Sequence, residues 1–401
     1  MCCFSSTPQP ASPIAIPRWG VAMLPGSAEQ YSDVTGMGVH MVRRGLRWTA
    51  AEPNAPVAGV RTYTWVAHDA AVARANAAGV KLLGVLANGP QWACPGPANS
   101  GPTNVQDYLD YVNAISARYA GRVDGYEIWN EPQGNGLSTL LYKTMLIGAY
   151  LIIKANDPAA MVVGIVANGT FVDANSATRN AWYNTVLSDA QVRASMDAAS
   201  VHTYTRPYPP EIGAATGPLD VRLANSNALL ASKGFSNPVF VTEGNWPSAG
   251  TTPGVVSEAD QARFIVRMAI INGLFCARFY PFHMYGYVSA DEAGGMGFIR
   301  PDGTHKPSYT AWRTMAGVLD DTVINISAVS TGNTRCYRFD RSNGTYGFAA
   351  WCVTGTADLQ LTGLPLSIRQ TTLLGVESIL ATTDGALTVA LTGDPVYIDT
   401  Q

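Results

Sequence analysis

Short runs of apolar and β-branched residues alternate along most of this chain with segments whose apolar residues recur at helical spacing. This alternation favours a parallel α/β architecture, because each helical segment can return the chain to the start of the next parallel strand. Eight strands are predicted, at residues 18–23, 39–44, 80–86, 123–129, 161–167, 199–204, 239–242 and 276–282. Residues 17–320 are therefore expected to form one α/β domain.

The segments between the predicted strands carry helix start and stop residues. Residues 105–120 follow a capping candidate, Thr103 or Asn104, place their apolar side chains on one stripe and stop at Gly121. Further helices are predicted at residues 66–78, 221–233 and 306–319. Eight β/α units within about 300 residues fit a (β/α)8 TIM barrel. A doubly wound open sheet is the competing layout, but it usually has a Gly-rich phosphate loop, and none follows the first predicted strand.

The pattern changes after Asp320 and Asp321, where helical periodicity ends. Short alternating stretches follow, separated by turn residues such as Asn343 and Gly344. Residues 321–401 are therefore predicted to form a small β-sandwich. At the other end, residues 1–16 are rich in proline and serine and are predicted to be a flexible tether.

Two cysteines flank the turn at Asn343 and Gly344 almost symmetrically. With a three-residue hairpin loop, Cys336 and Cys352 would lie directly opposite each other, near enough to form a disulfide. Such a bond requires an oxidising compartment. Two buried free thiols are the alternative. No C-x-x-C pair occurs in the sequence, which argues against a zinc or redox role for the cysteines.

The charge content bears on the partners of the chain. Only 14% of residues are charged and the net charge is −3, so the sequence lacks the basic surface that nucleic acid requires. No uninterrupted apolar run approaches the roughly 18 residues of a membrane span.

Cys2 or Cys3 is either the lipidation site of a bacterial lipoprotein whose signal has been removed or part of an ordinary disordered start. A secreted, periplasmic or cell-surface location is expected.

Two of the predicted strands end on a glutamate. In the first, Pro132 has no N–H, so the strand stops and leaves Asn130 and Glu131 at its carboxyl end. The second ends on Glu243, which Gly244 follows. The carboxyl ends of barrel strands meet at one face, where barrel active sites form. Two carboxyl groups at that face suffice to cleave a glycosidic bond, because one protonates the leaving oxygen and the other stabilises the oxocarbenium-like centre.

Residues 129–132, Trp-Asn-Glu-Pro, resemble the acid/base motif of clan A glycoside hydrolases, and residues 242–244, Thr-Glu-Gly, resemble their nucleophile motif. The chain resembles family 39 most, with family 5 as a relative, and residues 391–398 resemble the end of the β-sandwich in family 39. The resemblance implies retaining hydrolysis of β-linked oligosaccharides or polysaccharides without a cofactor, with Glu131 as acid/base and Glu243 as nucleophile. Transglycosylation at the same site and a catalytically silent glycan-binding barrel are the alternatives.

The same resemblance assigns polar residues around the two glutamates. Asn130 would bind the sugar 2-hydroxyl, Arg43 would hold Glu243 ionised, Tyr204 would donate to Glu243, and His202 would contact substrate. For Arg43 the alternative is a surface ion pair. Strict strand alternation would turn Asn130 away from its neighbour, so we expect the strand to twist or bulge at its end. The negative charge of Glu243 is expected to raise the pKa of the acid/base glutamate.

Aromatic residues near the predicted strand ends suggest walls for sugar rings, which stack on flat apolar faces. Trp92 and Trp246 directly follow strand ends and are the preferred platforms, with Tyr280 as a further candidate and His283 as a weaker substrate contact. Glu127 is interpreted as a buried structural carboxylate. No His, Asp or Glu residues show metal-ligand spacing along the sequence, so no catalytic metal is predicted.

Overall fold

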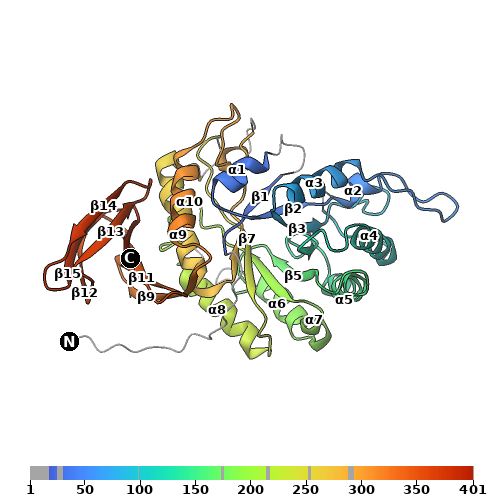
Figure 1. Cartoon of the computed structure of the whole chain (residues 1–401). Coiled ribbons are helices and arrows are strands. Elements are labelled where there is room, and N and C mark those ends of the chain that lie inside the picture. Colours follow the sequence, from blue (N-terminus) through green and yellow to red (C-terminus); the bar gives the residue numbers. More distant parts are fainter. Residues whose placement is uncertain are drawn as a thin grey trace.

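The computed structural model describes residues 18–24, 30–97, 99–172, 176–213, 217–251, 254–287 and 293–400. Eight parallel strands form one sheet in chain order, from β1 (Val21–Met23) to β8 (Arg278–Phe279), and Figure 1 shows helices around them. A parallel bridge joins Trp19 to Phe279, and the Gly20 amide donates to the Phe279 carbonyl at 2.9 Å. The sheet thus closes on itself, and the predicted (β/α)8 barrel is confirmed.

Each of the eight predicted strands has a counterpart in the barrel. The other strands are β2 (Met41–Gly45), β3 (Lys81–Leu86), β4 (Gly125–Ile128), β5 (Met161–Ala167), β6 (Ala198–His202) and β7 (Val239–Glu243). The prediction for β5 agrees at both ends. β8 is much shorter than predicted, because Pro281 has no N–H with which to continue the ladder.

Helices connect the strands and cover the outside of the barrel (Figure 1). They are α1 (Tyr31–Gly36), α2 (Trp48–Ala51), α3 (Val66–Ala77), α4 (Val105–Arg118), α5 (Thr139–Asn156), α6 (Ala177–Leu187), α7 (Ala190–Ala194), α8 (Leu219–Ser232), α9 (Glu258–Phe275) and α10 (Pro307–Val318), with a 3-10 turn η1 (Ala293–Met296). Of the two capping candidates for α4, Asn104 is the cap, since its side chain accepts from the Gln106 amide at 3.1 Å. No helix in these described segments is both long and apolar enough to cross a membrane.

The interior of the barrel changes from apolar to polar along the strand direction. Near the amino ends one buried cluster is formed by Met41, Leu83, Val163, Ala198, Phe240 and Tyr280. Alternate residues of a strand point the same way, so the residues two and four positions after Ala198, namely Ser200 and His202, also face inward. On β2, Arg43 follows Met41 in the same way. This alternation carries polar side chains up to the carboxyl end of the barrel.

The last part of the chain forms two antiparallel sheets that lie beside α9 and α10 (Figure 1). The larger has the order β14-β13-β16-β11-β10-β9 and the smaller pairs β12 with β15. Their bounds are β9 (Val323–Thr331), β10 (Thr334–Arg341), β11 (Tyr346–Cys352), β12 (Ala357–Thr362), β13 (Ser367–Thr372), β14 (Glu377–Ala381), β15 (Ala386–Leu391) and β16 (Val396–Asp399). Phe348 and Ile398 of the larger sheet pack with Leu361 and Val389 of the smaller one, so the predicted β-sandwich is confirmed.

The hairpin register corrects the predicted cysteine pairing. Cys336 lies opposite Ala350, and Cys352 lies opposite Thr334. The turn is centred on Asn343 rather than Gly344, which shifts the pairing by two residues. Both cysteines are buried free thiols, as the alternative prediction had it.

Domain limits and the N-terminal tether remain predictions. α10 ends at Val318 and β9 begins at Val323, and we keep 17–320 and 321–401 as proposed limits of the two domains. The tether of residues 1–16 lies outside the described residues, and so do Cys2 and Cys3 with the suggested lipid anchor.

Candidate active site

The backbone after β4 explains how two consecutive residues enter the same site. Trp129 has φ 67° and Glu131 has φ 44°, both in the left-handed region that side chains other than glycine rarely adopt. The predicted irregularity at the end of this strand is therefore present, as left-handed backbone rather than a ladder bulge. Asn135 holds the segment, since its Nδ2 donates to the Asn130 carbonyl at 2.9 Å and to the Glu131 carbonyl at 3.2 Å. Strain fixed in this way is typical of functional sites.

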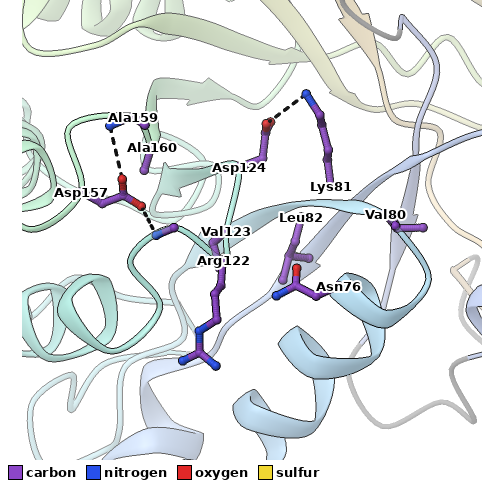
Figure 2. A pocket seen from close by; sticks show the side chains of 12 residues that line it. Asn76, Val80, Lys81, Leu82, Arg122, Val123, Asp124, Asp157, Ala159 and Ala160 are labelled. Atoms are coloured by element: carbon purple, nitrogen blue, oxygen red, sulfur yellow. Dashed lines mark hydrogen bonds and ion pairs between the residues drawn. The ribbon is translucent and has the colours of Figure 1, made fainter.

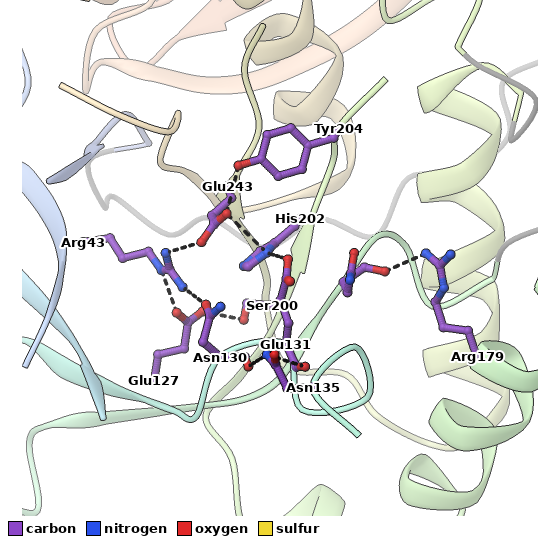
Figure 3. A network of polar contacts seen from close by, with 11 residues as sticks. Arg43, Glu127, Asn130, Glu131, Asn135, Arg179, Ser200, His202, Tyr204 and Glu243 are labelled. Carbon is purple, nitrogen blue, oxygen red and sulfur yellow. Dashed lines mark hydrogen bonds and ion pairs between the residues drawn. The ribbon is translucent and has the colours of Figure 1, made fainter. Parts of the chain in front are cut away.

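The two strand-end glutamates lie together at the carboxyl end of the barrel (Figure 3). One oxygen of Glu131, one oxygen of Glu243 and a ring nitrogen of His202 all lie within 4.8 Å of one another. His202 Nδ1 is 2.6 Å from Glu131 Oε1 and 3.6 Å from Glu243 Oε2. The Glu131 side chain is 23% exposed and that of Glu243 12%, whereas His202 is fully buried. Solvent therefore reaches both carboxylates, and the histidine lies beneath them.

Arg43 connects the polar residues of the site through one guanidinium (Figure 3). Its Nη1 donates to Glu243 Oε1 at 2.7 Å, and its Nη2 donates to Asn130 Oδ1 at 2.8 Å. Its Nε donates to Glu127 Oε2 at 2.6 Å, and Ser200 Oγ donates to the other Glu127 oxygen at 2.6 Å. Glu127 is completely buried, which agrees with a structural role. The planar fork fixes Glu243 and Asn130 relative to each other.

The second oxygen of Glu243 also accepts a hydrogen bond. Tyr204 OH donates to Glu243 Oε2 at 2.8 Å, as the resemblance implied. Burial and the charge of Glu243 raise the pKa of Tyr204 well above its ordinary value, so the hydroxyl keeps its proton. Both oxygens of Glu243 thus accept hydrogen bonds from protein donors, which fixes the orientation of the carboxylate.

The electrostatics of Glu131 differ from the prediction. Burial alone would raise the pKa of Glu131, but the hydrogen bond with His202 lowers it. The charges of His202, Arg43 and Arg179 lower it further, and the pKa lies below its ordinary value. For His202, burial opposes the imidazolium, but Glu243 and Glu131 raise the pKa. The predicted rise in the pKa of Glu131 is therefore wrong, because a histidine bonds it directly. The two groups titrate as a coupled pair, and both pKa shifts favour a proton on His202 over one on Glu131.

Glu131, His202 and Glu243 also have the donor types of a divalent-cation site. They are distant in sequence, so a search for metal-ligand spacing could not group them. The guanidinium of Arg43 already places a positive charge 2.7 Å from Glu243, and a cation would have to share that carboxylate with it. The absence of a catalytic metal remains a prediction.

Two of the proposed sugar contacts are corrected by the structure. Trp246 is fully buried, packs against Phe264 and donates through Nε1 to the Tyr208 carbonyl at 3.0 Å, so it offers no face to a sugar. Tyr280 is 1% exposed and belongs to the apolar cluster at the amino end of the barrel, where its hydroxyl meets Arg278. Both residues follow strands. The side chain of Trp246 lies beneath the loop that carries Tyr208, and that of Tyr280 points toward the amino end of the barrel.

The roles of Trp92 and His283 as substrate contacts stay predictions. Trp92 is half-buried, contacts Trp48 edge-on and donates to the Glu52 carbonyl at 3.2 Å. His283 is fully buried and its ring lies beside that of Tyr287, with centroids 5.7 Å apart.

Sequence reasoning missed two residues that hold the site. Ser200 binds Glu127, and strand alternation could have found it, because it lies two residues before His202 on the same strand. Asn135 holds the carbonyls after β4, but it lies in a turn with no periodicity to reveal it.

A hollow of about 380 Å³ lies at the opposite end of the barrel (Figure 2). Lys81, at the start of β3, lies 3.7 Å from Asp124, and Asp157 accepts from the Gly121 amide at 2.8 Å. Barrel active sites form at the carboxyl ends of the strands, where Glu131 and Glu243 lie together, so we assign the candidate active site to that end and not to this hollow.

Solved structures of other proteins share the fold of this chain. No protein-family model and no curated protein matches the chain. A family 39 glycoside hydrolase from the gut symbiont Bacteroides cellulosilyticus WH2 matches with a TM-score of 0.77 at 22% identity, over 96% of this chain and 81% of that one. The fold is that of glycoside hydrolases. The predicted likeness to family 39 is thus confirmed at the level of the fold.

Two further solved structures show the same fold over nearly their whole length. A family 30 endoxylanase from Clostridium papyrosolvens C71 has a TM-score of 0.68 at 12% identity, over 98% of each chain. A family 39 β-xylosidase from Caulobacter crescentus has a TM-score of 0.65 at 18% identity, over 98% of this chain and 97% of that one. Both the barrel and the sandwich are therefore shared.

Proposed function

We propose that the protein is a retaining glycoside hydrolase that cleaves β-linked glycosides by double displacement, with Glu243 as nucleophile and Glu131 as acid/base. The observation that carries this proposal is the spacing of the two carboxylates, since one oxygen of Glu131 lies within 4.8 Å of one oxygen of Glu243. Retaining enzymes hold these groups about 5–5.5 Å apart, whereas inverting enzymes separate them by roughly 6.5–9.5 Å to admit a water molecule.

In the first displacement, Glu243 attacks the anomeric carbon while the bond to the leaving oxygen breaks. Arg43 and Tyr204 orient the carboxylate for this attack, since each donates to one of its oxygens. Glu131 delivers a proton to the leaving oxygen. Because both pKa shifts favour the proton on His202, we infer that it passes from His202 to Glu131 before or during this step.

In the second displacement, Glu131 accepts a proton from water, whose oxygen attacks the anomeric carbon and releases Glu243 as a carboxylate. The proton returns to the pair that Glu131 forms with His202. Asn130, held by Arg43, is positioned to bind the hydroxyl next to the anomeric centre. Two inversions at one carbon give net retention.

β-Xylosides are the first substrates to test, because the solved structures with this fold include a β-xylosidase and an endoxylanase. Since glycans of this kind lie outside cells, we keep the secreted, periplasmic or cell-surface location as part of the proposal.

The testing experiment is to trap the covalent intermediate. A 2-fluoro-β-glycoside with a good leaving group should inactivate the enzyme and leave a sugar ester on Glu243, which peptide mass spectrometry can locate. Glu131→Gln serves as the control, since with such a leaving group it should still be labelled. Tight binding of the sugar without any labelling or turnover would instead support a silent glycan-binding barrel.

A further inference from the structure

The β-sandwich contacts the barrel through a buried polar cluster that the proposed reaction does not use. Trp351 of β11 is fully buried, and its Nε1 donates to Glu211 Oε1 at 2.6 Å. The other oxygen of Glu211 lies 3.6 Å from Nη1 of Arg267 on α9, and both side chains are 1% exposed. Nη2 of Arg267 donates to the carbonyls of Cys352 at 3.0 Å and Gly393 at 2.6 Å. Glu211 is therefore held jointly by the sandwich and by a barrel helix bound to the sandwich.

Glu211 lies on residues 203–213, the described part of the loop that leaves β6 at the candidate active site. Tyr204, near the start of this loop, donates to Glu243. Between them the loop is bonded at Tyr208, whose carbonyl accepts from Thr205 Oγ1 at 3.1 Å and from Trp246 Nε1 at 3.0 Å. Separate hydrogen bonds at Glu211, Tyr208 and Tyr204 thus hold the loop at three points, and the loop backbone joins them from the sandwich to the nucleophile.

The Trp351 contact matters because the Glu211 carboxylate is buried. A carboxylate that loses a donor in such surroundings must find another partner or move. Glu211 belongs to a loop rather than to a helix or strand, so movement of the loop backbone is the easier response. A shift of the loop would change the geometry of the Tyr204 hydroxyl at Glu243.

We propose that Glu211 is a positioning residue through which the β-sandwich holds Tyr204 against the nucleophile Glu243. This inference rests on the proposed function, because Tyr204 acts on the reaction only through Glu243. It assigns the sandwich a part in the geometry of the active site although the sandwich contributes no residue to it.

The chain offers a matched control at the same interface. Arg335 of β10 donates to Asp220 at 2.8 Å, and the two side chains are 8% and 18% exposed. Asp220 belongs to α8 and not to residues 203–213. Asp220→Asn therefore weakens the contact between sandwich and barrel without removing a partner of Glu211.

The kinetic test is a double-mutant cycle in the full-length enzyme. Trp351→Phe should lower kcat on an aryl β-glycoside about threefold to tenfold, and less than about twofold when Tyr204→Phe is already present, since coupled residues are not additive. KM should change less than kcat. Asp220→Asn should have no such coupling to Tyr204→Phe. Equal factors for Trp351→Phe in both backgrounds would mean that the sandwich does not act through Tyr204, and the inference would be overturned.

Amide hydrogen exchange tests the same coupling without a substrate. Trp351→Phe should speed exchange in residues 203–213 about tenfold or more, whereas Asp220→Asn should leave that segment nearly unchanged. Unaltered exchange in this segment overturns the inference even in an active enzyme. Faster exchange in a chain that cleaves no glycoside supports the coupling and counts against the proposed function alone. If Trp351→Phe fails to fold, Glu211→Gln replaces it. The Gln amide oxygen can still accept from Trp351, but the negative charge that faces Arg267 is lost. The effects of Glu211→Gln on kcat and on exchange should be smaller than those of Trp351→Phe and in the same direction.

Discussion

The two ends of the barrel each hold a buried arginine bonded to a carboxylate, yet only one end has the geometry of an active site. At the amino end, Arg278 donates to Asp124 at 2.7 Å, and Lys81 approaches the same carboxylate at 3.7 Å. At the carboxyl end, Arg43 serves two carboxylates, one of which, Glu243, is partly exposed. Losing Asp124 would leave the buried Arg278 without its carboxylate partner, which is costly, but one carboxylate between two cations does not provide the pair of carboxyl groups that the reaction needs.

The difference shows that a buried ion pair is not itself a sign of catalysis. What distinguishes the carboxyl end is a second accessible carboxylate, Glu131, within 4.8 Å of the first. It also has a histidine, His202, whose Nδ1 lies 2.6 Å from Glu131 Oε1. Within this site the pKa of Glu131 is lowered and that of His202 is raised. Opposite shifts of neighbouring groups are common where a site transfers protons. Four predictions test the contrast, from the largest expected effect to the smallest.

Removing the nucleophile should abolish the reaction. Glu243→Ala cannot form the glycosyl-enzyme ester, so kcat should fall by about 10⁴-fold or more on every substrate. Steady-state kinetics on activated and unactivated glycosides provides the measurement. Residual activity within about 100-fold of the parent would require another nucleophile.

Removing the acid/base should give a loss that depends on the leaving group. Glu131→Ala should lose about 10²–10⁴-fold on substrates with poor leaving groups, because they need protonation. On substrates with acidic leaving groups the loss should be much smaller, and azide should restore turnover by attacking the intermediate to give a β-glycosyl azide. Equal losses on both substrate types, with no azide effect, would contradict the assignment of roles.

Removing the histidine should move the pH profile. In the parent enzyme the shared proton leaves at the raised pKa of His202, and activity falls as pH rises through that value. In His202→Asn the proton is held by the Glu131 carboxyl alone. The pKa of this carboxyl rises when the histidine that lowered it is removed, but it starts from the lower ordinary value of a carboxyl, so the alkaline limb of kcat/KM should shift to lower pH. An alkaline limb at the same pH in both enzymes would show that His202 does not carry the proton. The profile should be measured on a substrate with a poor leaving group.

The corresponding change at the amino end should affect stability and not catalysis. Asp124→Asn removes the charge that Arg278 and Lys81 share, and the free energy of unfolding should fall by about 1–3 kcal/mol. At a temperature where the variant is folded, kcat should stay within about twofold of the parent value, because distant sites act independently. Denaturant titration and kinetics on the same preparation measure both effects. A large loss of kcat in the folded variant would erase the contrast between the two ends.

The sequence predicts much of this molecule because the decisive information is local. Strand periodicity and helix stops locate the barrel, and Pro132 marks the end of the strand that carries Glu131. The sequence does not show in which direction a side chain near a strand end points in the folded protein. Trp246 and Tyr280 follow strands just as a sugar platform would, but both are buried. Their orientation depends on loops and layers that no local pattern encodes.

Two other misses have the same origin. The pKa of Glu131 depends on His202, a contact between residues 71 positions apart, so no local motif reports it. The cysteine register depends on whether Asn343 or Gly344 is central to the turn, and a shift by one residue there moves each partner by two. In both cases the sequence identified the residue, a strand-end glutamate or a hairpin cysteine, but it did not identify the residue that lies opposite it in the fold.

The measurement that tests the central claim most directly is the configuration of the first product, followed by proton NMR during cleavage of a β-glycoside. If Glu131 and Glu243 act by double displacement, the β-anomer appears first and the α-anomer accumulates only later by mutarotation. Initial release of the α-anomer would mean a single displacement by water, and it would contradict the retaining mechanism that the spacing of the two glutamates supports.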